Sequence, residues 1–175
     1  MHLRIAPHPS PIGTLLIVTD DQAQLRALDF DDREADMRKW LRLHYGAVTL
    51  PPGETPRATL HALDAYFAGD LAAIDALPVA TGGTPFQREV WAALRAIPAG
   101  RTLGYGELAA QLGRPGASRA VGMANNANPI SIVVPCHRVI GKSGTLTGYG
   151  GGLERKRWLL EHEDRHAGVQ TRLPV

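Results

Sequence analysis

The chain has a single cysteine, Cys136, among 175 residues, and its aromatic content is only 6%. One cysteine cannot form a disulfide within the chain, and it excludes a zinc site built from several cysteines. A lone reduced thiol is typical of the cytoplasm, where we expect this protein to work. The thiol is either a small buried packing residue, the commonest fate of a free cysteine, or a reactive nucleophile. The local sequence leaves both interpretations open.

Long apolar runs are also missing. No stretch of 18 apolar residues occurs, so we expect no transmembrane helix and no membrane partner. The segment Met1–Pro7 does not contain the apolar core of a signal peptide. A hydrophobic content of 44% with 21% charged residues is ordinary for a globular protein, and the length suits one domain or two small ones.

Negative charge is scarce in the second half of the chain. Residues 1–80 carry seven Lys/Arg and eleven Asp/Glu, a net charge of −4. Residues 81–175 carry twelve Lys/Arg and six Asp/Glu, a net charge of +6. The C-terminal half is therefore the part suited to meet a polyanion such as a nucleic acid, although the two halves of many proteins differ in charge by chance.

Residues 1–80 predict a small α/β domain. Apolar β-type runs and helical patterns alternate there, at 12–19, 25–30, 32–45 and about 55–69. Thr55 offers an N-cap for the last of these helices, and Pro56 suits its first helical position. The segment contains no catalytic constellation.

Residues 81–163 predict a second, mostly helical domain, followed by a loosely held tail at 164–175. Thr84 and Gln87 form a capping box at the start of its first helix. Two short helical patterns, Tyr105–Leu112 and Ser118–Asn125, are joined by a Gly/Pro turn, with Ser118 as the expected cap. This arrangement is either a helix-turn-helix or a generic helical hairpin packed in a core.

The cysteine follows an apolar run. Ile130–Val134 favours a buried strand that delivers the thiol of Cys136 to a turn marked by Pro135. An imidazole, His137, comes next, and a guanidinium, Arg138, follows it. Thiols attack as thiolates, which nearby positive charge favours.

These residues, with others in the same order and spacing, resemble the O6-alkylguanine-DNA alkyltransferases. The match runs from about Thr84 to Glu163 and is carried by Tyr105, Ser118–Gly122, Asn128-Pro129, Pro135–Val139, Gly151–Leu153 and Trp158–Glu163. The resemblance implies an α/β (α+β) protein with an N-terminal ribonuclease-H-like domain. It implies a mostly helical C-terminal domain with a helix-turn-helix.

The resemblance also implies an irreversible alkyl transfer. The family moves an alkyl group from O6 of guanine in DNA, and in some cases from O4 of thymine, to its own cysteine. Cys136 is the implied nucleophile, and because the protein is consumed in one turnover, no cofactor is expected. His137 is the implied base, acting through a water, and Glu163 is expected to orient it and to stabilise its charge.

The implied base pocket holds a guanine that has been flipped out of the duplex. Tyr105 is expected to donate to N3 of the base, and the carbonyls of Cys136 and Val139 to accept from its amino group. The backbone N–H of Gly150 is expected to face O6, and Tyr149 to form a wall.

The implied partner is double-stranded DNA, bound through the minor groove. The helix that starts at Ser118 is expected to enter the groove, where the small residues Ala120 and Gly122 allow close approach. Arg119 is the implied finger that fills the gap left by the flipped base. We expect a monomer, and cooperative assembly on DNA stays open.

Two further residues carry expectations from the resemblance. Asn128 is expected to tie the recognition helix to the active-site strand. Ser131 stands where some relatives carry proline, which packs on bulky alkyl groups, so we expect weaker reaction with benzyl than with methyl adducts. No metal is expected, because residues 1–80 contain no cysteine to hold the structural zinc that some relatives carry.

Three alternatives remain beside this interpretation. A non-catalytic relative would bind alkylated DNA and flag it for other repair proteins, although such relatives replace the cysteine. A helix-turn-helix regulator with a structural cysteine would not need Tyr105, Asn128 and Glu163 together. A cysteine hydrolase would turn over repeatedly and gain no mass.

Overall fold

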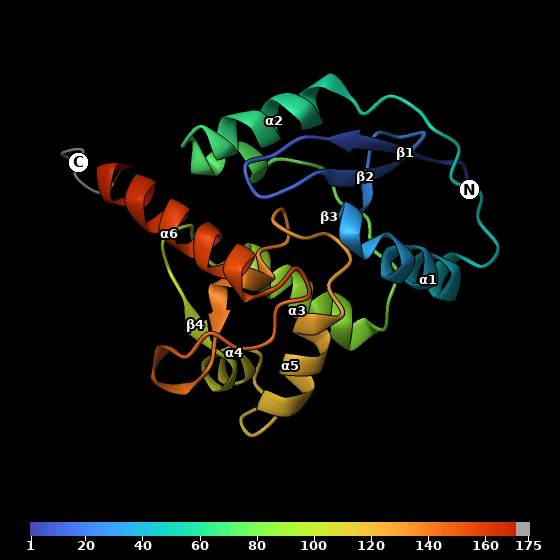
Figure 1. Ribbon diagram of the computed structural model, residues 1–175. Coiled ribbons are helices and arrows are strands. Elements are labelled where there is room, and N and C mark those ends of the chain that lie inside the picture. The colour runs from blue at the N-terminus through green and yellow to red at the C-terminus, as the bar shows by residue number, and fades with distance from the viewer. Residues whose placement is uncertain (171–175) are drawn as a thin grey trace. The chain divides into compact units, whose positions relative to one another are not determined.

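The computed structural model describes residues 1–170, apart from the side chains of Ser143 and residues 168–170 (Figure 1). The chain forms two compact units. The first comprises Met1–Gly83 and Pro129–Val133, and the second comprises Thr84–Asn128 and the chain from Val134 onward. None of the described helices is long and apolar enough to cross a lipid bilayer.

A three-stranded antiparallel sheet organises the first unit, in the order β1-β2-β3 (Figure 1). Its strands are β1 (Leu3–His8), β2 (Leu15–Asp20) and β3 (Leu25–Phe30). The sequence predicted the second and third of these strands and missed β1. Pro7 obscures the β1 pattern, but a proline is tolerated in a strand at the edge of a sheet, where a ladder hydrogen bond is not required of it.

Helices complete the first unit: η1 (Asp31–Arg33), α1 (Glu34–Tyr45), α2 (Arg57–Phe67) and η2 (Leu71–Ile74). Met37 and Leu41 of α1 are buried in one apolar cluster with side chains of all three strands. The predicted cap of α2 is wrong. Pro56 occupies the cap position in an extended conformation, and no side chain caps the helix, so Thr55 lies outside it.

The second unit is mostly helical, as predicted. Its helices are α3 (Pro85–Arg95), α4 (Tyr105–Gln111), α5 (Ser118–Asn126) and α6 (Leu153–Gln170). Short elements lie between them: β4 (Leu103–Gly104), η3 (Cys136–Arg138), β5 (Val139–Ile140) and η4 (Lys142–Gly144). β4 and β5 pair in parallel, and α5 packs against both α3 and α4.

Two helix starts and one helix end test the sequence predictions. The capping box of α3 is confirmed, because Thr84 and Gln87 exchange both hydrogen bonds. The cap of α5 is Ala117, so Ser118 is the first helical residue and not the cap. α6 was expected to end at Glu163 but continues to Gln170, because the half-buried His166 and Ala167 give the extension a packed side. Residues 171–175 of the predicted tail lie outside the described part.

The expected strand over Ile130–Val134 is wrong. Only Ile130 pairs, through an isolated parallel bridge to Leu28, and the chain then turns. Ile132 has a φ of 73°, a strained left-handed conformation for a β-branched residue. A short, fully buried apolar run does not distinguish a strand from a buried turn, because both bury every side chain.

Candidate active site

The cysteine stands at the first position of a tight turn. Cys136 opens η3, and Pro135 holds the cap position before it. The Cys136 N–H donates to the Val134 carbonyl at 2.8 Å, and the Val139 N–H donates to the Cys136 carbonyl. The residue is 6% exposed. A thiol in this position is fixed by its backbone and almost shielded from bulk water.

The two residues that follow Cys136 in this turn, His137 and Arg138, both bind the carboxylate of Glu163 on α6. His137 Nε2 lies 2.7 Å from Glu163 Oε1. Arg138 donates to both oxygens of the same carboxylate, from Nε to Oε2 at 2.9 Å and from Nη2 to Oε1 at 2.8 Å. Its Nη1 donates to the Ile97 carbonyl at 2.6 Å. All three side chains are buried, and the predicted pairing of His137 with Glu163 also includes Arg138, which we expected only as a positive charge near the thiol.

The charge state of Glu163 sets the tautomer of His137. Burial by itself raises the pKa of Glu163, but the charges and hydrogen bonds of His137 and Arg138 hold it well below its usual range. An ionised carboxylate only accepts hydrogen bonds, so His137 Nε2 carries a proton and donates it. In the neutral ring the lone pair then lies on Nδ1.

His137 Nδ1 is buried and has no hydrogen-bond partner in the described part of the chain. The ring therefore has one nitrogen that pairs with Glu163 and one that is left as an acceptor. Arg138 shares the carboxylate of Glu163 with His137, and the hydrogen bond to Glu163 orients the imidazole ring.

A buried lysine, Lys156, is a feature that the sequence analysis missed. Its Nζ donates to the carbonyls of Val139 and Thr147, both at 2.7 Å. Burial lowers the pKa of Lys156, and its attraction to the charge of Cys136 opposes that effect. Tyr105 Oη donates to the same Thr147 carbonyl at 3.4 Å. Lys156 thus connects the end of the nucleophile turn to the loop that Tyr105 contacts.

A sequence signal for Lys156 exists in its helical position. Lys156, Leu159 and Glu163 are spaced at i, i+3 and i+7, which places them on one face of α6. Leu159 is fully buried, so a lysine on that face predicts a buried cation with dedicated partners.

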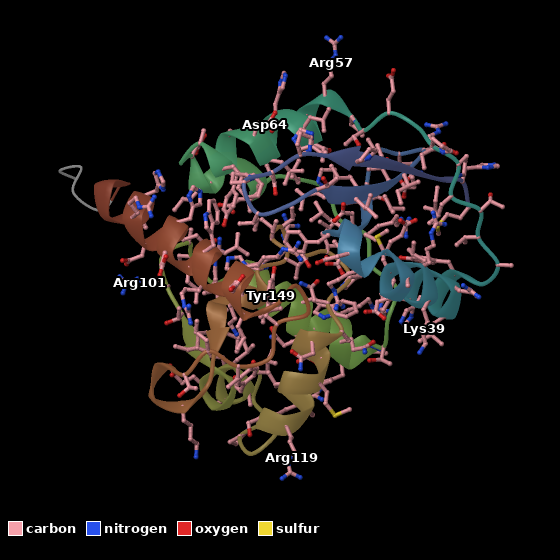
Figure 2. The ribbon with its side chains drawn as sticks, in the orientation of Figure 1. Lys39, Arg57, Asp64, Arg101, Arg119 and Tyr149 are labelled. Atoms are coloured by element: carbon pink, nitrogen blue, oxygen red, sulfur yellow. The ribbon has the colours of Figure 1, made fainter. Side chains whose placement is uncertain are left out.

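A cavity of about 870 Å³ lies beside α4 and α5. Four of the predicted residues line it: Tyr105, Ser118, Arg119 and Gly122. Figure 2 shows the exposed Arg119 side chain projecting away from the ribbon at the start of α5. The structure therefore brings together the residues expected to meet DNA and the tyrosine expected to meet the base.

The remaining predicted residues fall in three places. Ala120 is exposed on α5, and Gly150 is exposed in the loop before α6, where Tyr149 is half-buried. Residues 129–133 form a segment of the first unit between two parts of the second. Asn128 donates from Nδ2 to the Val134 carbonyl at 2.8 Å, so this hydrogen bond joins the two residues that flank the segment. Ser131 is buried within that segment of the first unit.

The fold and this site define a class of protein: a two-unit α/β protein in which two packed short helices, α4 and α5, share one unit with a cysteine next to a buried His–Glu pair. Comparison with known families identifies the member of the class. Residues 4–81 match the ribonuclease-like domain of 6-O-methylguanine DNA methyltransferase, and residues 85–165 match the DNA-binding domain of the same family. The chain belongs to the 6-O-methylguanine DNA methyltransferase family.

Individual relatives agree with this assignment. The chain is 58% identical over 161 residues to the methylated-DNA–protein-cysteine methyltransferase of Salmonella typhimurium, covering 88% of this chain and 91% of that protein. It is 59% identical over 169 residues to the protein of the same description from Mycolicibacterium paratuberculosis, covering 94% of each. The crystal structure of Mycobacterium tuberculosis OGT in complex with DNA superimposes with a TM-score of 0.78 at 42% identity, over 95% of this chain and 94% of that one.

These findings confirm four of the sequence predictions: the family, the fold class, the methyltransferase activity and DNA as a partner. They favour the transferase over the non-catalytic lesion binder. The roles of individual residues, the groove that is bound and the oligomeric state remain predictions.

Proposed function

We propose that this protein repairs O6-alkylguanine in DNA by moving the alkyl group to the sulfur of Cys136, once per molecule. The observation that carries this proposal is the turn that places the buried Cys136 beside His137, whose ring is oriented by an ionised Glu163. A soft thiolate that attacks a methyl carbon needs positioning and proton removal, and this site supplies both.

The bonds and protons of the transfer balance without a cofactor. The Cys136 thiol loses its proton through a water to His137 Nδ1, and a sulfur–carbon bond forms as the O6–carbon bond breaks. The electron pair of the broken bond stays on the guanine, which takes up a proton from Tyr105 at N3, and the proton held by His137 returns through water to Tyr105. The product is a thioether, which has no thiolate left for a second attack, so each molecule acts once.

The carbonyls of Cys136 and Val139, both expected to accept from the guanine amino group, differ in the hydrogen bonds that they already accept. A carbonyl oxygen has two lone pairs. The Cys136 carbonyl already accepts from the Val139 N–H and from Asn125. The Val139 carbonyl accepts from Lys156, so we expect its second lone pair to receive the amino group. The Gly150 N–H and Tyr149 complete the pocket in this proposal.

The same proposal places α5 in the minor groove of double-stranded DNA. The exposed, small Ala120 and the cavity-lining Gly122 allow close approach to the sugar-phosphate walls, and the exposed Arg119 replaces the flipped base in the stack. Flipping costs a few kcal/mol, least for a damaged, weakly paired base. The protein acts as a monomer in the cytoplasm, and Ser131 limits its reaction with bulky adducts.

Stoichiometry tests this function. Duplex containing O6-methylguanine is mixed with a limiting amount of protein, and restored guanine is counted by digestion and chromatography. We expect repair to stop at one lesion per protein molecule, and Cys136→Ser to repair none. Continued repair beyond one lesion per molecule would indicate a hydrolase, and tight binding without repair would indicate a lesion-flagging protein.

A further inference from the structure

An asparagine on the inner face of α5 contacts the residue that carries the nucleophile. Asn125 is 2% exposed, and its Nδ2 donates to the Cys136 carbonyl at 3.4 Å. Its Oδ1 is buried and has no hydrogen-bond partner in the described part of the structure. No sequence motif pointed to this residue.

The unpaired oxygen argues against a role in stability. Burying a hydrogen-bond acceptor without a donor costs free energy, whereas an apolar side chain of similar shape at such a position is close to neutral or stabilising. Asn125 therefore retains an amide at a site where leucine would fit the interior better. The hydrogen bond to the Cys136 carbonyl is the contact that leucine would lose.

That carbonyl belongs to the peptide group between Cys136 and His137. It is held from one side by the Val139 N–H of the turn and from the other by the Asn125 amide. The orientation of this peptide group fixes the directions of both side chains, the thiol and the imidazole. Asn125 thus acts on the two reacting side chains at once.

The same helix presents the opposite face to solvent. Arg119 and Ala120 of α5 are exposed, whereas Asn125 is buried. A hydrogen bond from the inner face of this helix to the nucleophile residue therefore links the surface expected to meet DNA with the thiol. Asn128 makes a comparable tie further along, to the Val134 carbonyl before the turn.

We propose that Asn125 is a positioning residue for the transfer: its amide fixes the Cys136–His137 peptide group relative to α5. It does not touch the substrate and acts through Cys136. The inference rests on the proposed alkyl transfer. It predicts that losing the amide misaligns the thiol while leaving DNA affinity intact, and small misplacements of reacting atoms are costly.

Two variants separate positioning from stability. Asn125→Leu removes both the donor and the unpaired acceptor, so we expect it to unfold at the same denaturant concentration as the wild type or a higher one. Its single-turnover rate with saturating O6-methylguanine duplex should fall on the order of tenfold. Asn125→Gln keeps the amide but adds a methylene to a packed interior, so it should be less stable and yet faster than the leucine variant.

Binding is measured separately, by duplex titration of each variant in a Cys136→Ser background, and should be unchanged. Val90→Ala, a truncation of a fully buried side chain on α3, is the control for lost stability alone, and should transfer at the wild-type rate while folded.

The outcomes distinguish the inference from the proposed function. A wild-type protein that transfers no methyl group overturns the proposed function and this inference with it. If the wild type is active, three results would overturn the inference alone. Asn125→Leu could transfer as fast as the wild type, the transfer rates could follow the order of stability, or the slower rate could be matched by weaker DNA binding. A slower, fully stable leucine variant with normal binding supports it.

Discussion

The two units bury different kinds of side chain. Among described residues, the buried polar side chains of the first unit are Thr19, Thr59 and Ser131, none of which is charged. The second unit buries the cluster His137, Arg138, Lys156 and Glu163 around one cysteine. Burying charge is costly and rarely improves stability over apolar packing, so such clusters mark functional sites. The contrast shows that the first unit is organised for folding and that the second places chemistry in its interior.

The sharpest way to break this contrast is to remove one cation from the buried cluster. Arg138→Met leaves Glu163 with one partner and frees the Ile97 carbonyl, so we expect a loss of about 3–5 kcal/mol in the free energy of unfolding. Arg38→Met, which removes the exposed pair with Glu34 in the first unit, should cost less than about 1 kcal/mol. Denaturant titration of both variants measures the difference. Equal losses would mean that the buried network is no more important to folding than a surface pair.

The second largest expected effect is that of replacing Lys156 on the single-turnover rate of transfer. Lys156→Met removes the bonds to the Val139 and Thr147 carbonyls, so the base pocket loses its link to the nucleophile turn. We expect single-turnover transfer to slow by roughly a hundredfold, because alignment of the reacting groups is lost. The change removes a buried charge but leaves the Val139 and Thr147 carbonyls without this donor, so we expect a loss of about 1–3 kcal/mol in the free energy of unfolding. A variant that is unstable but transfers at the normal rate when folded would show that the lysine is structural.

On acidification, one buried carboxyl in each unit should change the free energy of unfolding in opposite directions. The folded pKa of Glu163 is depressed, so below about pH 4.3 the unfolded chain takes up a proton that the folded chain does not. This carboxyl therefore contributes stability above that pH and loses it on acidification, by about 1.4 kcal/mol per pH unit. Glu163→Gln should flatten this slope.

Asp29 of β3 in the first unit should behave in the opposite way. Its burial raises its pKa, despite the hydrogen bond from the Phe30 N–H and the charge of Arg33. The folded state then holds a proton that the unfolded chain has released, so this carboxyl adds stability as pH falls through its raised pKa. Asp29→Asn should remove that gain. Urea titrations between pH 3 and pH 6 measure both variants, and slopes of the same sign would contradict the assignment.

The smallest expected effect concerns the exposed face of α5. Arg119→Ala should slow repair in duplex DNA by about fivefold, a fraction of the few kcal/mol that base flipping costs. Repair of the same lesion in a single strand, where no stacked partner needs replacing, should change less. Parallel single-turnover assays on the two substrates test this, and equal losses would make Arg119 a simple phosphate contact.

The sequence predicted what periodicity and local motifs encode. The capping box at Thr84, the helices flanking the Gly/Pro turn and the pairing of His137 with Glu163 all follow from short-range patterns or a dense family resemblance. β1 was missed because a proline interrupts it, and the strand at Ile130–Val134 was wrong because burial alone does not define hydrogen bonding.

The interior polar network was harder to predict from the sequence. The helical position of Lys156 indicates a buried cation, and Arg138 stands out as a charge beside the thiol, but the hydrogen-bond partners of Arg138, Lys156 and Asn125 appear only in the three-dimensional packing. A side chain that acts through a distant backbone carbonyl leaves no local motif. Such contacts therefore need a three-dimensional structure to be found.

The most direct measurement for the central claim is the mass of the peptide that contains Cys136 after reaction with O6-methylguanine duplex. The buried cluster is expected to prepare this thiol as a single-use acceptor. The account predicts that the peptide gains one methyl group in proportion to the lesions removed, and that His137→Ala slows the gain while the protein stays folded. Complete repair with an unmodified Cys136, or a methyl group found on another residue, would contradict it.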